Sequence, residues 1–211
     1  MLKVKFETQA QWLAGRLKKI TGTRLKEIVV KKGTGKKIGF YELIAENLAV
    51  DDSEFEGYVP NETPMDRGTR LQKYAVDQFR KTTGKDVDES LVLWTREDNP
   101  NIAYSPDGVV IGSDDTETVE TKCLSSARHV EAYLTNTIPD DYEFQKLQSF
   151  IVNEKQQKLY FCFYDPRLPS IAFFYIVVTR EEVKAEIEQY LEYQRKTLAE
   201  VDEIVAKLSG F

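Results

Sequence analysis

Three charged side chains in the middle of the sequence have the types and spacing of a cation-binding hydrolytic site. Asp107 follows Pro106, and Glu120 and Lys122 come about a dozen residues later. Because side chains alternate across a strand, Glu120 and Lys122 share one face of an extended segment, and Asp107 can face them from the preceding strand. Carboxylates are ligands that Mg²⁺ prefers, and a nearby lysine can orient or deprotonate an attacking water. The stretch predicts a magnesium site, and the alternative is a surface hairpin with a salt-bridged face.

The segment around these residues has the pattern of two short strands joined by a polar turn. The β-branched run 109–111 predicts the first strand, and 119–123 predicts the second. Between them, residues 112–115 have the composition of a turn. The turn therefore folds the second strand back beside the first.

The remaining elements predict an α/β fold with a central mixed sheet flanked by helices, organised as one domain over 1–211. Apolar spacing and capping residues predict helices over 8–19, 23–30, 40–49, 66–83, 125–134, 142–152 and 180–208. The helix over 66–83 is expected to bury Leu71, Ala75, Val76 and Phe79 and to end at Gly84, and Ser125 or Ser126 is expected to cap the helix over 125–134. Alternating or continuous apolar runs predict further strands over 91–94, 102–104, 159–164 and 171–178. Residues 31–37 and 50–65 are expected to be connections.

The charge of the chain is distributed unevenly. The net charge is −6 over 211 residues, yet residues 1–37 hold eleven Lys or Arg against two Glu. A basic segment on an acidic chain favours one phosphate-facing surface over a general affinity for nucleic acid. The alternative is a solvated basic face without a partner.

The cysteine count and the hydropathy exclude several classes of protein. Cys123, Cys162 and His129 are the only cysteines and the only histidine, too few for a closed zinc site or a four-cysteine iron–sulfur cluster within one chain. Both thiols are expected to be buried in a reducing, cytoplasmic compartment. No stretch is apolar enough to span a bilayer, and the first residues lack the apolar core of a signal peptide, so we expect no membrane association.

Pro106-Asp107 followed by Glu120-Thr121-Lys122 resembles the signature of PD-(D/E)XK nucleases. Over roughly 12–205 the order of motifs resembles, more narrowly, the phage lambda exonuclease family within them. The matching residues are Trp12, Arg16, Ile20-Thr21, Thr23, Gly68, Ser105-Pro106-Asp107-Gly108, Glu120-Thr121-Lys122-Cys123, Tyr142, Gln145, Gln148 and Tyr164-Asp165-Pro166-Arg167. This resemblance implies a PD-(D/E)XK restriction-endonuclease-like fold.

The resemblance also implies roles for individual residues. Asp107, Glu120 and the backbone carbonyl of Thr121 would bind Mg²⁺, for which Mn²⁺ could substitute, and Lys122 would position or deprotonate the water. Gln72 stands where the family pattern has a glutamate, so it would reach a metal only through water, which puts a second metal in doubt. The residues that would hold the 5′-phosphate of DNA are Arg16, Thr23, Ser105 and Gln145.

The resemblance further implies the reaction and its partners. The family degrades linear double-stranded DNA from 5′ ends to mononucleotides, serves phage recombination with a single-strand annealing protein, and forms homotrimers. We expect the same of this chain in the host cytoplasm. The alternatives are a PD-(D/E)XK endonuclease, for which cutting of closed circles would speak, and a non-catalytic DNA-end-binding recombination protein, for which Gln72 leaves room.

Overall fold

The computed structural model describes residues 8–14, 35–51, 59 and 62–209. The chain forms two compact units. Unit 1 comprises Met1–Leu71, Cys123–Thr137 and Phe163–Phe174, and unit 2 comprises Gln72–Lys122, Ile138–Cys162 and Tyr175–Phe211. The expectation of one nuclease domain over 1–211 stays a prediction, and the helix predicted over 23–30 lies outside the described residues.

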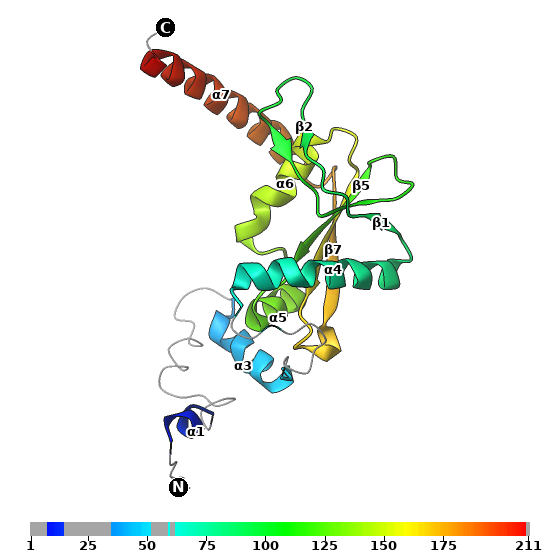
Figure 1. Ribbon diagram of the computed structural model, residues 1–211, viewed down its shortest axis with the longest axis vertical. Helices are drawn as coiled ribbons and strands as arrows, with labels where there is room; N and C mark the ends of the chain where they lie inside the picture. Colours follow the sequence, from blue (N-terminus) through cyan, green and yellow to red (C-terminus); the bar gives the residue numbers. More distant parts are fainter. Residues whose placement is uncertain (1–7, 15–34, 52–58, 60–61, 210–211) are drawn as a thin grey trace. The chain divides into compact units, whose positions relative to one another are not determined.

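A five-stranded mixed sheet forms the centre of the fold (Figure 1). Its strands, in spatial order, are β1 (Val87–Asp88), β4 (Gly108–Val110), β5 (Glu117–Lys122), β6 (Lys158–Tyr164) and β7 (Phe173–Thr179). The pairs β1–β4 and β4–β5 are antiparallel. The backbone N–H of Lys158 donates to the carbonyl of Thr116, so β5 and β6 begin at the same end and run parallel. The predicted mixed sheet is therefore confirmed.

The helix that leads into unit 2 is α4 (Pro64–Thr83), and its sequence sets both of its ends. At the start, Thr63 Oγ1 accepts from the backbone N–H of Asp66, and Pro64 occupies the first helical position. At the end, Gly84 has φ 70°, a conformation that glycine adopts without steric cost. As predicted, Leu71, Ala75, Val76 and Phe79 form the buried side.

Aromatic contacts show how helices flank the sheet within unit 2. The ring of Phe79 on α4 lies 5.0 Å from that of Tyr160 on β6. The next strand residue, Phe161, points to the opposite face, and its ring centroid lies 6.1 Å from that of Tyr142. Tyr142 ends a 3₁₀ turn, η2 (Asp140–Tyr142), that leads into α6 (Glu143–Val152), and α6 packs against α7 (Lys184–Ser209). Helical segments thus cover both faces.

Unit 1 has a small core of its own. Helix α3 (Ile38–Leu48) packs against α5 (Ser126–Thr135), and the unit also contains the short helix α1 (Gln9–Ala14) and the 3₁₀ turn η3 (Pro169–Ile171). Of the two serines predicted as caps, Ser125 is the one that caps α5, and its side chain accepts from the backbone N–H of Arg128. The buried residues shared by α3, α5 and the loop after β6 are Tyr41, Ala45, Val130 and Leu168.

Several boundary predictions are wrong. The strand predicted over 91–94 is reduced to β2 (Trp94–Thr95), which pairs with β3 (Ala103–Tyr104), because Leu91 and Leu93 are exposed and pair with no strand. Strand β7 starts at Phe173 because η3 takes up Ile171. The two-residue strand β1 was not predicted. Among the described residues, no helix is long and apolar enough to cross a membrane.

Gly108, which starts β4, is required by a close approach of β1. A Cβ atom at this position would lie 2.3 Å from Cγ1 of Val87, which is itself buried. We therefore expect Gly108→Ala to lower the free energy of unfolding by about 1–3 kcal/mol. In a Val87→Ala background the methyl group has room, so the same substitution should cost much less. Denaturant unfolding of the four proteins in this double-mutant cycle measures the coupling, and a cost that is equal in both backgrounds would contradict the steric explanation.

His129 on α5 should make unit 1 sensitive to mild acid. Its Nε2 donates to the carbonyl of Ile171 at 2.8 Å, while Nδ1 is buried without a partner among the described residues. Burial lowers the pKa of His129 below its ordinary value of 6.5. The unfolded chain therefore binds a proton more readily, so stability is complete above about pH 6.5 and falls as the pH drops below it. We expect His129→Phe to flatten the fall in unfolding free energy between pH 7 and 5, and an unchanged slope would refute this.

Candidate active site

The two acidic residues of the motif lie at one end of the β4–β5 pair, within unit 2. Gly108 is paired with Val119, so Asp107, just before β4, is opposite Glu120 on β5. Glu120 is only 6% exposed. Burial raises the pKa of Glu120, the negative charge of Asp107 raises it further, and Lys122 opposes both effects. The structure therefore brings these two carboxylates into electrostatic contact.

Each oxygen of the Glu120 carboxylate has a defined partner. Oε1 accepts from Nζ of Lys122 at 2.5 Å, which agrees with the predicted placement of both side chains on one strand face. Oε2 accepts from the hydroxyl of Tyr104 at 2.9 Å. This second contact was not anticipated from the sequence. It joins β3 to β5 across sixteen residues of chain, a separation that local patterns do not reveal.

Asp107 is held by Thr121, in a way that differs from the prediction. Its Oδ2 accepts from the backbone N–H of Thr121 at 2.7 Å and from the Thr121 hydroxyl at 2.9 Å. Because Thr121 lies between Glu120 and Lys122 on the strand, strict alternation would place its side chain on the opposite face from theirs. Asp107 precedes β4, so the alternation of that strand does not fix where its side chain points. The carboxyl group can therefore reach Thr121 while remaining opposite Glu120.

Lys122 lies against aromatic rings. Its Nζ is 5.3 Å from the centre of the Tyr142 ring and 5.8 Å from that of Phe161. The electron-rich faces of these rings favour a cation, and the side chain remains partly accessible. Tyr142 belonged to the sequence motif without an assigned role. In the structure its ring is one of the two that the ammonium group of Lys122 faces.

The residues at this end of the strand pair fit a hard divalent cation. Mg²⁺ is usually bound in proteins by one or two carboxylates together with water and substrate phosphate. Asp107 and Glu120 supply two carboxylates, and the second oxygen of Asp107, Oδ1, has no hydrogen bond among the described residues. Across all the residues that the structure describes, no group of three or more His, Cys, Asp or Glu side chains is arranged to hold a metal ion. The donor set thus matches a site that relies on substrate and water for its remaining ligands.

The other predicted site residues are placed less closely. Ser105 is exposed, and its hydroxyl donates to the carbonyl of Val92 at 2.5 Å. Gln145 is exposed on α6, and Gln72 is half-buried on α4. Within the described part of the chain, no hydrogen bond joins either amide to the acidic pair. Arg16 and Thr23 lie outside the described residues.

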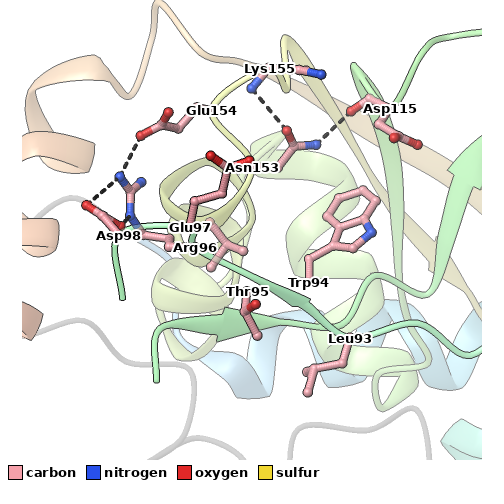
Figure 2. Close-up of a pocket in the computed structure, with 11 residues that line it drawn as sticks. Leu93, Trp94, Thr95, Arg96, Glu97, Asp98, Asp115, Asn153, Glu154 and Lys155 are labelled. Atoms are coloured by element: carbon pink, nitrogen blue, oxygen red, sulfur yellow. Dashed lines mark hydrogen bonds and ion pairs between the residues drawn. The ribbon is translucent and has the colours of Figure 1, made fainter. Parts of the chain in front are cut away.

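Unit 2 also contains a cavity of about 680 Å³, beside Trp94 and the loop after α6 (Figure 2). Arg96 lines it, but most of its donors are already used. Nε and Nη2 donate to Asp98, Nη2 also to Glu154, and Nη1 to the carbonyl of Ile151. Four of the five guanidinium N–H groups are therefore already used, two of the three acceptor groups are carboxylates, and little of the positive charge is left for an anionic ligand. We assign this cavity no chemistry.

The comparisons with solved structures agree with the predicted fold. An alkaline exonuclease (LHK-Exo) from Laribacter hongkongensis is similar at 26% identity and a TM-score of 0.60, over 96% of this chain and 99% of that one. The same protein in complex with dAMP is similar at 25% identity and a TM-score of 0.60, over 96% and 98% of the two chains. A phage-related exonuclease from Haemophilus somnus 129PT has 13% identity and a TM-score of 0.45, over 97% and 91%. No curated protein matches the sequence significantly.

A family model defines the relationship more closely. Residues 11–156 match the model of the YqaJ-like viral recombinase domain. The matched range contains Asp107, Glu120 and Lys122, the three residues that meet at the end of the β4–β5 pair. It also contains the predicted phosphate-binding positions. The chain belongs to the family of YqaJ-like viral recombinase domains.

Proposed function

We propose that the protein is a Mg²⁺-dependent deoxyribonuclease that degrades linear double-stranded DNA from its 5′ ends and releases 5′-mononucleotides. The observation that carries the proposal is the meeting of Asp107, Glu120 and Lys122 at the end of the β4–β5 pair, in a chain of this family. Two solved structures of an alkaline exonuclease, similar over almost their whole length, support the nuclease reading.

In the proposed reaction, some residues of the site bind the cation and another acts on the attacking water. Asp107, Glu120 and the backbone carbonyl of Thr121 would hold the cation. Bound Mg²⁺ would supply positive charge to the phosphate as negative charge develops on it. Lys122 would either position the attacking water by a hydrogen bond from Nζ or, as a neutral amine, accept its proton. The rings of Tyr142 and Phe161 favour the cationic Nζ of Lys122 at its place beside Glu120.

The 5′ end of the DNA needs a second binding region. We assign the 5′-phosphate to Arg16, Thr23, Ser105 and Gln145, because a guanidinium fork, hydroxyls and an amide suit a phosphate. Ser105 lies two residues before Asp107 and is exposed, so its hydroxyl can exchange the Val92 carbonyl for a ligand. The basic residues of 1–37 would attract the DNA backbone. Gln72 would contribute at most a hydrogen bond to a metal-bound water.

The biological setting follows from the family. We propose a role in phage-type recombination, with a single-strand annealing protein as partner, a homotrimer as the active form and the host cytoplasm as the location. The description of the family as viral recombinase domains supports the role in recombination. Free thiols at Cys123 and Cys162 are compatible with a reducing compartment. The molar mass of the full chain, measured by sedimentation, tests the trimer, and the mass of a monomer would refute it.

The polarity and end requirement can be tested with three DNA substrates of the same sequence. These are a linear duplex with 5′-phosphates, the same duplex with 5′-hydroxyls, and a covalently closed circle. We expect fast digestion of the 5′-phosphorylated duplex, slower digestion of the 5′-hydroxyl duplex and no digestion of the circle. A label at the 5′ end should appear in mononucleotides before a label at the 3′ end does. Cutting of the circle would establish an endonuclease instead. Binding of DNA ends without cleavage in Mg²⁺ or Mn²⁺ would establish a non-catalytic end-binding protein.

A further inference from the structure

Two hydroxyl groups that the sequence did not single out each hold one of the two carboxylates. The Tyr104 hydroxyl donates to Oε2 of Glu120 at 2.9 Å, and the Thr121 hydroxyl donates to Oδ2 of Asp107 at 2.9 Å. We propose that Tyr104 and Thr121 are positioning residues that orient these two carboxylates for the divalent cation. The inference rests on the proposed function, because it presupposes that the carboxylates bind a cation.

Tyr104 is rigidly supported, as a positioning residue must be. It is 8% exposed, and its strand partner Trp94 lies against its ring with the centroids 6.3 Å apart. The preceding residue, Ala103, is fixed from α6, because Nε2 of Gln148 donates to its carbonyl at 3.0 Å. Gln148 is in turn paired with Gln194 on α7 by two reciprocal amide hydrogen bonds. The tyrosine hydroxyl therefore reaches Glu120 from a strand that two helices hold in place.

The contact matters because Glu120 has few other constraints. Its carboxylate is buried and can rotate about the last side-chain bond, where the torsional preference is broad. Lys122 holds one oxygen, but its ammonium lies at the end of a long, flexible side chain. Tyr104 holds the other oxygen without taking part in the chemistry. Hydrogen bonds that orient metal ligands in this way typically change metal affinity by about 10- to 100-fold.

The Thr121 hydroxyl also orients a carboxylate, that of Asp107, but it is not the only donor that does so. Oδ2 of Asp107 also accepts from the backbone N–H of Thr121, so loss of the hydroxyl leaves one of two hydrogen bonds. Without the hydroxyl, the orientation of the Asp107 carboxylate, and with it the position of Oδ1, is less well fixed. We therefore expect Thr121→Val to weaken cation binding less than Tyr104→Phe does. Both substitutions preserve the shape of the side chain, and Thr121→Val leaves the backbone carbonyl in place.

The chain offers a matched control on the same strand. Tyr160 donates its hydroxyl to Oε2 of Glu117 at 2.9 Å, so Tyr160→Phe removes the same kind of hydrogen bond from another glutamate of β5. Glu117 is three residues from Glu120 and therefore points to the other face of the strand. If the effect of Tyr104→Phe were only structural, Tyr160→Phe should produce it as well. Thermal unfolding without metal checks that each variant is folded.

The test is a titration of the metal-free full-length protein with Mn²⁺, followed by electron paramagnetic resonance of the free ion. The wild type should have a saturable site that Glu120→Gln removes. Tyr104→Phe should raise its dissociation constant by about 10-fold, Thr121→Val by less, and Tyr160→Phe should bind as the wild type does. Wild-type affinity in both Tyr104→Phe and Thr121→Val, with the site still lost in Glu120→Gln, would overturn this inference alone. Equal binding by wild type and Glu120→Gln would overturn the proposed function with it.

Discussion

The substitution Lys122→Met is expected to slow hydrolysis of linear duplex DNA by about 10²- to 10⁴-fold, the range typical of a lost general acid or base. Methionine retains an unbranched side chain of similar length, but it loses the ammonium group that faces Tyr142 and Phe161 and cannot position or deprotonate a water. The loss should appear in the rate at saturating DNA, with binding of DNA ends unchanged. Single-turnover digestion of an end-labelled duplex measures this rate.

A second lysine provides the control for that experiment. Lys85 forms an ion pair with Oε2 of Glu117 at 2.9 Å, and its Nζ lies 5.8 Å from the centre of the Tyr160 ring. Lys85→Met thus removes a lysine–glutamate pair beside an aromatic ring elsewhere in unit 2. It should digest DNA at the rate of the wild type. If Lys122→Met kept a rate close to that of Lys85→Met, Lys122 would have no chemical role.

The largest effect on stability is expected from Asp165→Asn in unit 1. Asp165 is fully buried and accepts hydrogen bonds from Arg67 at 2.9 Å, from Nε of Arg167 at 2.8 Å and from the Ser126 hydroxyl at 2.7 Å. Asparagine fits the space but carries no charge, so two arginines would lose their common anionic partner. Breaking a buried ion pair from one side costs about 3–5 kcal/mol. Denaturant unfolding should show a loss of this size.

The pH dependence of the same variant adds a second measurement. Burial by itself would raise the pKa of Asp165, but the hydrogen bonds and charges of Arg167, Ser126 and Arg67 lower it below its ordinary value. Its contribution is therefore complete above the unfolded pKa and is lost as the pH falls toward the folded pKa. The difference between wild type and Asp165→Asn should narrow on acidification below about pH 4.

Asp98→Asn is a useful comparison for this cluster. Asp98 also binds two arginines, Arg96 and Arg195, but its side chain is substantially exposed. Arg96 would keep Glu154 and the carbonyl of Ile151 as partners. We expect a much smaller loss than in Asp165→Asn, because exposed ion pairs contribute little to stability. Equal losses in the two variants would show that burial of Asp165 is not what makes it important.

The sequence predicted the elements whose signals are local. The buried side of α4 was predicted residue by residue, because Leu71, Ala75 and Phe79 recur at helical spacing. The caps at Ser125 and Gly84 were equally predictable, since each is set by one side chain or one backbone conformation. The meeting of Glu120 with Lys122 followed from the two-residue period of a strand.

What the sequence could not predict depends on contacts between distant segments. Nothing local indicates that Tyr104 meets Glu120, or that Asp165 binds Arg67 from a helix almost a hundred residues earlier. The run at 91–93 is apolar enough to suggest a strand, yet Leu91 is fully exposed because no strand pairs with it. Strand β1 is too short to produce a periodic pattern and exists because it pairs with β4.

The most direct measurement of the central claim compares wild type with Glu120→Gln on a linear 5′-phosphorylated duplex, in Mg²⁺ and in the presence of a chelator. Glutamine keeps the size of the side chain and removes the charge that would hold the cation beside Asp107 and Lys122. We predict progressive release of mononucleotides by the wild type in Mg²⁺, none with the chelator, and none by folded Glu120→Gln. Digestion by Glu120→Gln at the wild-type rate, or digestion that persists without divalent metal, would contradict the assignment of the active site.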